Sequence, residues 1–195
     1  MLRLWGRTSS INVRKVLWTL QELGVPFERI DAGLAYGHNH TPDYLAKNPN
    51  ALVPLLEDGD FTLWESNAIV RYLCARHAAA TLYPEDLRTR FDAERWMDWQ
   101  QTTLNRAGGP AFIQWIRTPA EQRQLAVIAQ SVAATEPLLQ MLDAHLATRP
   151  WLAGEHFTVA DIPIGCEIHR WWGLPQPRPA LPNLARWYTA VQARP

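Results

Sequence analysis

The sequence predicts an α/β N-terminal domain followed by an all-α C-terminal domain. Strand and helix patterns alternate up to residue 79, whereas the apolar residues after residue 88 recur at helical spacing. The pattern breaks between these stretches, around Leu82-Tyr83-Pro84. We therefore expect domains at residues 1–79 and 89–195, joined by a linker at residues 80–88.

The first elements are predicted to form a βαβ unit. Residues 2–5 are apolar at alternate positions, which is typical of a strand. From Val13 to Leu23 the apolar residues follow the spacing of one helix face, and Gly24 stands where a helix C-cap belongs. A second strand is expected at residues 25–30, parallel to the first, with the helix as the crossover.

A β-hairpin is predicted next. The runs 54–57 and 60–64 flank Asp58-Gly59, a dipeptide that favours a tight turn. Between residue 31 and this hairpin we expect a loop rich in Gly, His and Asn. The polar residues 65–67 then cap a helix, so the domain is expected to run β-α-β, loop, β-β-α.

Two capping boxes are predicted to start helices in the second half. Residues 118–121 place Thr at the N-cap, Pro at the first helical position and Glu at the third. Residues 158–161 repeat the box, with Phe157 and Ile162 as a hydrophobic staple. We therefore expect Asp161 to stabilise the fold rather than to act as a catalytic acid.

Prolines and glycines are expected to shape these helices. Pro137 lies inside an apolar helical series, so we expect a kink or break near it. Gly108-Gly109-Pro110 is expected to interrupt the helical pattern. The prolines of residues 175–182 delay the last helix until Asn183.

The composition excludes several classes of protein. The 195 residues carry 19 basic and 19 acidic side chains, and this zero balance argues against nucleic acid as a partner. No apolar run approaches the length of a membrane span, so no membrane is expected. Cys74 and Cys166 lie far apart and form no disulfide framework, which favours the reducing cytoplasm.

Motifs for nucleotides, zinc proteolysis and the hydrolase nucleophile elbow do not occur in the sequence. His38-Asn39-His40 offers two metal-ligating side chains, but no third ligand accompanies them. We therefore expect a solvated loop there and no metal site.

The segment between the first strand and the first helix is the best candidate for chemistry. It contains Ser9, Ser10 and Asn12 at a helix N-terminus, where free backbone N–H groups and the helix dipole stabilise an anion. Ser10 is either a plain N-cap or a hydroxyl aimed at a bound anion, and the spacing leaves both open.

Five segments, in this order, resemble those of the cytosolic glutathione S-transferases, in particular the serine-type bacterial branch near the theta, delta and nu classes. They are Thr8 to Lys15, Asn48 to Pro54, Trp64 to Ile69, Leu82 to Pro84 and Phe157 to Ile162. The resemblance runs from residue 2 nearly to the C-terminus. It implies a thioredoxin-like N-terminal domain that binds glutathione and a helical C-terminal domain that supplies most of the second-substrate pocket.

The resemblance implies particular glutathione contacts. Val53-Pro54 matches the family's cis-proline dipeptide, whose Val backbone pairs with the cysteinyl part of glutathione. The residues alone favour an ordinary strand-start proline at Pro54. Glu65 and Ser66 match the acid and hydroxyl that hold the γ-glutamyl end. A simple N-cap is the competing interpretation of Ser66.

The resemblance also implies a catalytic serine. Ser10 occupies the position of the thiol-activating serine, and Asn12 resembles an asparagine found beside that hydroxyl in some bacterial members. Ser9 is the rival, because a one-residue slip in the loop exchanges the two serines. Neither Tyr nor Cys occurs in this loop, which disfavours the tyrosine-type and cysteine-type branches.

The sequence departs from the family just before the Val-Pro pair. Several branches have a polar side chain where this chain has Ala51 and Leu52. We expect this contact either to be lost or to come from Asn50, Lys47 or His40, each of which is otherwise a solvated loop residue.

For the second substrate, position in the first loop and near the end of a long helix singles out Arg7, Arg106, Phe112 and Trp115. Core or surface packing is the competing interpretation of each. The resemblance implies a detoxifying glutathione transferase that activates the glutathione thiol as a thiolate for attack on a small apolar electrophile. Glutathione is its co-substrate, and no permanently bound cofactor is expected. Family members pair as homodimers, which we expect here.

Two alternative functions stay open. One is a glutathione-dependent disulfide reductase or peroxidase, because serine and asparagine sites in some bacterial relatives support such chemistry. The other is a non-catalytic member of the fold that binds glutathione or a protein.

Overall fold

The structure, a computed structural model, describes residues 1–77 and 80–195. It divides into two compact units, Met1–Tyr83 and Pro84–Arg194. The division falls within the stretch expected as a linker, and the domain end expected at residue 79 lies outside the described residues.

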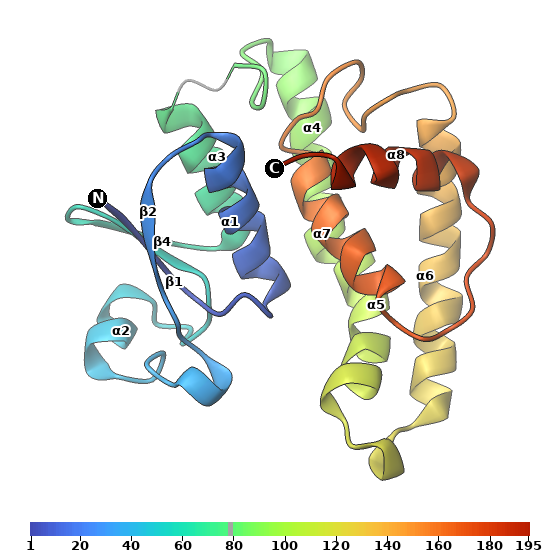
Figure 1. The fold of residues 1–195 in the computed structure, drawn as a ribbon, viewed down its shortest axis with the longest axis horizontal. Helices are drawn as coiled ribbons and strands as arrows, with labels where there is room; N and C mark the ends of the chain where they lie inside the picture. The colour runs from blue at the N-terminus through green and yellow to red at the C-terminus, as the bar shows by residue number, and fades with distance from the viewer. Residues whose placement is uncertain (78–79) are drawn as a thin grey trace. The chain divides into compact units, whose positions relative to one another are not determined.

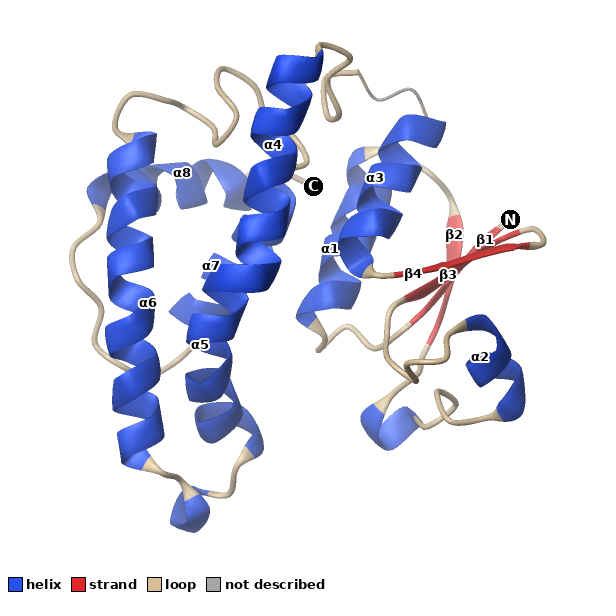
Figure 2. Ribbon diagram, turned by 180° about the vertical axis from the view of Figure 1, so that it is seen from behind, coloured by secondary structure: helices blue, strands red, loops and turns tan. Residues whose placement is uncertain are grey.

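The first unit is built on a four-stranded mixed sheet with the order β2-β1-β3-β4 (Figure 2). β1 (Leu2–Trp5) pairs in parallel with β2 (Phe27–Ile30) and antiparallel with β3 (Leu55–Asp58). β3 in turn pairs antiparallel with β4 (Phe61–Trp64). The predicted βαβ unit and the hairpin at residues 58–59 are therefore confirmed.

The crossover helix α1 (Ile11–Glu22) ends in a Schellman motif. Gly24 adopts φ +62°, and the Val25 amide donates to the Leu20 carbonyl at 3.1 Å. This confirms the expected C-cap. Because the Val25 amide closes the helix and Pro26 has no N–H, β2 begins two residues later than predicted.

α1 and α3 (Ser66–Arg76) lie side by side on one face of the sheet (Figure 1). Their apolar sides and the inward residues of β1 and β3 form the core of this unit, in which burial of each Leu or Val stabilises the fold by about 1.5–3 kcal/mol. The buried members are Leu2, Leu4, Val13, Val16, Leu20, Leu56, Ile69 and Leu73.

The opposite face of the sheet carries α2 (Pro42–Lys47). Trp5 alternates with the core residue Leu4 and so points to this face, where its ring meets Tyr44 of α2 with centroids 6.0 Å apart. The stretch was expected to be only loop. A helix of six residues is too short for an apolar period, although Thr41 does cap it by accepting from the Tyr44 amide.

The second unit is a helical bundle (Figures 1 and 2). A π-helical turn (Gln100–Leu104) links its first two helices, and a second one (Ile113–Arg117) follows them. The α-helices are α4 (Leu87–Trp99), α5 (Asn105–Phe112), α6 (Leu125–Leu146), α7 (Asp161–Trp172) and α8 (Pro182–Gln192).

The interruption expected at residues 108–110 is wrong, because α5 runs through it. Gly108 lets this helix approach α7 closely: a Cβ there would lie 3.2 Å from the Trp171 ring. The Ser131 hydroxyl of α6 bonds to backbone groups on either side of Pro110, which compensates for the disturbed helical ladder.

The helix start expected at residues 118–121 is also wrong. The Thr118 hydroxyl donates to the Ile113 carbonyl at 3.1 Å and closes the preceding turn instead of capping a helix. Ala120–Gln122 form a single 3₁₀ turn, and α6 begins at Leu125.

Of the kink or break expected near Pro137, the break does not occur, since α6 continues through this residue; the kink stays a prediction. Pro137 and Ala133, four residues earlier, are both exposed, so water reaches the carbonyl that loses its amide partner. The last helix begins at Pro182, next to the predicted Asn183.

The hydrogen bonds expected of the second capping box are present, although α7 begins later than predicted, at Asp161 with Ala160 as its N-cap. The Asp161 Oδ2 atom accepts from the Thr158 amide at 2.9 Å, and the Thr158 hydroxyl accepts from the Ala160 amide at 3.3 Å. Asp161 is fully buried at the start of α7 and also accepts from the Leu152 amide at 3.1 Å. These hydrogen bonds lie within the helical unit, which agrees with a structural rather than a catalytic role for Asp161.

α6 is longer and more apolar than the sequence patterns suggested. Within its 22 residues, an 18-residue window has a mean hydropathy of 1.3, which by length and composition alone is enough to cross a membrane. The expectation that no apolar run has this length is therefore wrong. The helix is nevertheless part of the bundle, where its Asp143 accepts from the Leu184 amide of α8 at 2.9 Å.

Candidate active site

The sheet brings the three expected glutathione segments to one end. Leu55 of β3 pairs with Trp5 of β1 and with Trp64 of β4. The serine loop follows β1, the Val53-Pro54 pair precedes β3, and Glu65 follows β4. All three segments therefore leave the sheet at the same end, although they are distant in the sequence.

Ser10 occupies the N-cap position of α1 without acting as a side-chain cap. Its backbone is extended, with φ −88° and ψ 124°, and its hydroxyl makes no capping hydrogen bond. The residue is only 8% exposed. The plain-cap alternative is therefore wrong for the side chain, and the hydroxyl is not used to hold the helix together.

The neighbours of Ser10 differ in exposure. Ser9 is exposed, whereas the Oδ1 atom of Asn12, in the first turn of α1, is buried and has no hydrogen-bond partner among the described residues. The Arg14 side chain reaches back to the Thr8 carbonyl at 2.7 Å and fixes the turn. A buried amide oxygen without a donor is costly, so this one marks a polar position that a ligand can satisfy.

The Val53-Pro54 peptide bond is cis. Leu52, just before it, is 65% exposed. Its carbonyl nevertheless accepts from the side-chain amide of Asn48 at 2.8 Å and from the Tyr44 hydroxyl at 2.5 Å. Two polar side chains thus hold the chain that leads into the cis bond.

Asn48 organises this loop from a nearly fully buried position. Its Oδ1 atom accepts from the Asn50 amide at 3.1 Å, and its carbonyl accepts from the Ala51 amide at 3.1 Å. Burial raises the pKa of Tyr44 to about 12, against a smaller lowering by Asn48, which keeps the phenol a hydrogen-bond donor. Sequence reasoning missed both roles, for which Asn48-Pro49 was the only signal.

Glu65 and Ser66 stand at the start of α3. Glu65 is its N-cap, at φ 73° and ψ 108°, and its exposed side chain makes no capping bond. Ser66 is the first helical residue and is 4% exposed. The simple N-cap interpretation of Ser66 is therefore wrong. A left-handed Glu costs about 1–3 kcal/mol, and such strain is concentrated at functional sites.

Arg7 lies beside the cis-proline loop. A Cβ built on Gly33 would lie 2.6 Å from Arg7 Nη1 and 3.4 Å from Val53 Cγ1, so both side chains pack against this glycine. Gly33 itself adopts φ +83°. The contact places a cation next to the expected cysteinyl subsite, and sequence reasoning did not identify Gly33.

The three expected substitutes for the missing polar contact have different surroundings. His40 and Asn50 have exposed side chains. The Lys47 ammonium donates to Glu57 Oε1 at 2.5 Å and lies 5.8 Å from the Trp5 ring centroid. Lys47 is therefore not a solvated loop residue.

The other second-substrate candidates belong to the helical unit. Arg106 is exposed on α5, and Phe112 and Trp115 are partly buried. Two guanidinium groups flank the Phe112 ring, those of Arg170 at 4.9 Å and Arg117 at 5.3 Å from the ring centroid. The helical unit thus presents aromatic rings with cations against them.

The described residues hold no group of three or more His, Cys, Asp or Glu side chains that would suit a metal ion. His38 is exposed with its ring 6.3 Å from that of Trp5, which agrees with the loop interpretation. A cavity of 330 Å³ opens next to it; its lining residues are Trp5, His38, Thr41, Asp43, Tyr44 and Lys47.

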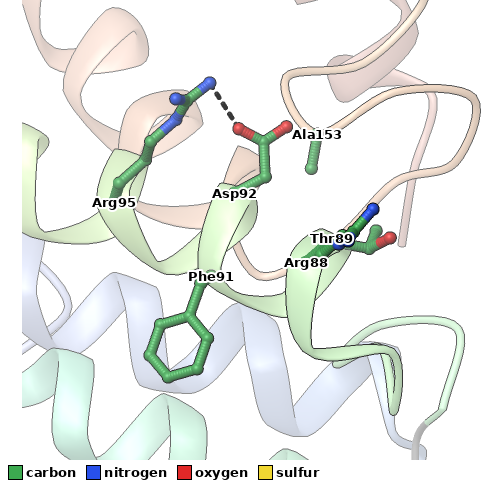
Figure 3. Close-up of a pocket in the computed structure, with 6 residues that line it drawn as sticks. All are labelled: Arg88, Thr89, Phe91, Asp92, Arg95 and Ala153. Carbon is green, nitrogen blue, oxygen red and sulfur yellow. Dashed lines mark ion pairs between the residues drawn. The ribbon is translucent and has the colours of Figure 1, made fainter.

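A larger hollow of 590 Å³ lies on α4 of the second unit (Figure 3). Asp92 forms ion pairs there with Arg95 and with Arg149, while the Phe91 ring points away from the Asp92-Arg95 pair. No expected site residue lines it. The lining residues are Arg88, Thr89, Phe91, Asp92, Arg95 and Ala153.

A mixed sheet of this order with a cis-proline before β3, followed by a helical bundle, defines a thioredoxin-like domain joined to an all-helical domain. Residues 1–75 match the glutathione S-transferase N-terminal domain, and residues 126–190 match the glutathione S-transferase C-terminal domain.

Known glutathione S-transferases are similar to this protein over the whole length of the chain. Glutathione S-transferase GstB of Escherichia coli K12 is 45% identical over 197 residues, which cover 100% of this chain and 95% of the relative. Glutathione S-transferase 3 of Zea mays is 32% identical over 202 residues, covering 100% and 90%. The theta class glutathione S-transferase of Xanthomonas axonopodis pv. citri, solved with glutathione bound, has a TM-score of 0.96 and 45% identity, covering 100% and 93%. The chain belongs to the cytosolic glutathione S-transferase family.

Proposed function

We propose that the chain is a glutathione transferase in which Ser10 activates the glutathione thiol. The observation that carries this is the unused, nearly buried Ser10 hydroxyl at the N-terminus of α1. The hydroxyl donates its hydrogen to the glutathione sulfur, and the positive end of the helix dipole adds to the stabilisation of the thiolate.

The energies involved are sufficient. A cysteinyl thiol of pKa about 8.5 is only a few per cent thiolate at neutral pH, and lowering this pKa by two units requires about 2.7 kcal/mol. A hydrogen bond to a charged group supplies about 1.5–3 kcal/mol and a helix terminus about 0.3–1 kcal/mol. No general base is needed, because the thiol proton leaves to water.

The other parts of glutathione are assigned to the loops at the same end of the sheet as Ser10. The Val53 backbone pairs with the cysteinyl unit in strand fashion next to cis-Pro54. The Glu65 carboxylate receives the γ-glutamyl ammonium group, and the Ser66 amide and hydroxyl receive its carboxylate. The unpartnered Asn12 Oδ1 supports a role for this residue beside the sulfur.

The glycyl carboxylate has fewer candidates. His40 and Asn50 have exposed side chains and are assigned to it. Lys47 contributes only if it shares its ammonium group with Glu57. Ser9 is the alternative hydroxyl at the sulfur, and its exposure argues against it.

In the reaction the thiolate sulfur attacks an electrophilic carbon of a small apolar substrate. A C–S bond forms, and the leaving group departs with the electron pair of the bond that breaks. Phe112 and Trp115 are assigned to contact with this substrate, and Arg106 and Arg7 are assigned to its polar substituents. Glutathione is consumed as co-substrate.

We also infer a homodimer that works in the cytoplasm in detoxification. Large apolar side chains are exposed in both units, including Leu52 at 65% and Phe91 at 62%, as expected of a surface that a second copy covers. Both cysteines are buried and neither is part of a disulfide among the described residues, which suits a reducing compartment.

The test combines calorimetry with a panel of assays. We expect glutathione to bind the purified protein and conjugation to occur with at least one apolar electrophile at fixed glutathione. Turnover of disulfides or hydroperoxides alone would favour the reductase or peroxidase alternative. Binding without turnover on any arm would favour a non-catalytic protein, and absence of glutathione binding would contradict the proposal.

A further inference from the structure

A buried carboxylate on α7 contacts the π-helical turn Gln100–Leu104, which links α4 to α5. Glu167 of α7 is 2% exposed, and its Oε2 atom accepts from the Gln100 side chain at 2.7 Å. Its Oε1 atom pairs with Arg170, one turn further along α7. The Arg170 side chain is itself only 12% exposed and also donates to Asn105 Oδ1 at 2.8 Å.

The same guanidinium group lies against an expected substrate residue. Its central carbon is 4.9 Å from the centroid of the Phe112 ring. A guanidinium group donates hydrogen bonds in its plane and stacks on aromatic rings through its face. The hydrogen bonds to Glu167 and Asn105 therefore fix the guanidinium plane of Arg170, against which the Phe112 ring packs. The ammonium group of a lysine has no such plane.

The backbone of α5 is fixed independently of Arg170. The Ser131 hydroxyl accepts from the Ala111 amide at 3.2 Å and donates to the Ala107 carbonyl at 2.5 Å. Gly108 brings this helix close to Trp171. The helix backbone is thus anchored by other groups, while Arg170 acts on the orientation of the Phe112 ring at its end.

Helical irregularity points to the same region. The π-helical turns Gln100–Leu104 and Ile113–Arg117 bracket α5, one containing Gln100 and the other following Phe112 directly. Such turns re-aim side chains and are frequent at functional sites. Glu167 contacts Gln100 in the first of these π-helical turns, and Arg170 contacts Asn105 directly after it.

We propose that Arg170 is a positioning residue for the second substrate: it sets the orientation of the Phe112 ring and thereby which apolar electrophiles are accepted. The inference rests on the proposed function, in which Phe112 contacts the electrophile. Arg170 itself touches neither glutathione nor the reacting atoms in this proposal.

The kinetic test compares two probes of different shape, 1-chloro-2,4-dinitrobenzene and 4-nitrobenzyl chloride. Arg170→Lys keeps the charge and removes the planar fork. The double variant Arg170→Met with Glu167→Gln removes both charges, so that no uncompensated carboxylate is left buried. Arg88→Met, an exposed arginine on α4, is the matched control.

We expect the ratio of kcat/KM for the two probes to change about tenfold in both Arg170 variants, the scale of discrimination in an apolar pocket. The KM for glutathione should stay unchanged, and the control should resemble wild type. A ratio that does not change, or a parallel rise of both substrates' KM that follows loss of stability, would overturn the inference.

A second readout does not depend on turnover. 4-Fluorophenylalanine is placed at position 112, and its fluorine NMR resonance is compared with and without Arg170→Lys. We expect the resonance to shift and broaden in the variant. An unchanged resonance rejects the positioning role, and a shifted resonance with an unchanged probe ratio rejects the role in specificity. Wild type that converts no electrophile of the panel contradicts the proposed function, and the fluorine result still decides the positioning role.

Discussion

The indole N–H of Trp187 donates to Oδ1 of Asp161 at 2.8 Å in the interior of the helical unit. The same carboxylate accepts from backbone amides of Leu152 and Thr158. One acidic side chain thus joins the start of α7 to α8 and to the segment before α7. Its burial outweighs these hydrogen bonds and raises the pKa of Asp161 to about 6.

This raised pKa predicts a pH dependence of stability. The folded protein takes up a proton on Asp161 more readily than the unfolded chain, whose pKa is 3.8, so the contribution is present below about pH 4 and is lost as pH rises through about 6. The difference between these two pKa values corresponds to about 3 kcal/mol in the free energy of unfolding. In urea unfolding, the free energy of unfolding of wild type relative to that of Asp161→Asn should fall by about 3 kcal/mol between about pH 4 and pH 7. A difference that is constant with pH would contradict the assignment.

Ser131 is expected to matter for stability because its hydroxyl serves two backbone groups of α5. Ser131→Ala leaves the Ala107 carbonyl and the Ala111 amide without this partner, and we expect a loss of about 2 kcal/mol in the free energy of unfolding. Thr102→Ala removes an exposed hydroxyl that donates to the Asp98 carbonyl four residues earlier, and it should cost less than about 0.5 kcal/mol. Equal losses in the two variants would show that Ser131 has no special role.

Gly33→Ala tests the packing of Arg7 against the cis-proline loop. The added Cβ would lie 2.6 Å from Arg7 Nη1, so the guanidinium group must move and Val53 is disturbed. We expect the Kd for glutathione to rise about tenfold, or about 1.4 kcal/mol. The measurement is calorimetric titration.

Gly37→Ala is the matched control for this change. Gly37 also has positive φ, at +64°, but nothing lies within 4 Å of its Cβ position. Both glycines combine positive φ with ψ outside the left-handed helical region, so both variants carry a backbone cost of about 1–3 kcal/mol. Only Gly33→Ala should weaken glutathione binding. Equal affinities in the two variants would contradict a role for the Arg7 and Val53 contact.

Local signals predicted most of the fold. Asp58-Gly59 and Gly24 act within a few residues, through turn and cap geometry that depends little on the rest of the chain. One error occurred where a distant group decides, and another where a local hydrogen bond competes with the expected cap. Pro110 stays in a helix because Ser131 bonds beside it, and Thr118 closes a preceding turn instead of starting α6.

The candidate site was predictable in part, because some of its residues lie in short segments that resemble those of a known family. Family-like segments indicated Ser10, the Val53-Pro54 pair and Glu65, and the sheet register brings their loops to one end. The roles of Asn48 and Gly33 depend on hydrogen bonds and close packing across the fold, for which spacing in the sequence carries no signal.

The most direct test of the account is the pH titration of glutathione thiolate absorbance in the complex. In wild type we expect an apparent pKa well below that of the free thiol. In Ser10→Ala this pKa should rise by about 1–2 units, the equivalent of one charge-assisted hydrogen bond, while Ser9→Ala should match wild type. An unchanged thiolate pKa in Ser10→Ala, with glutathione still bound, would contradict the central claim.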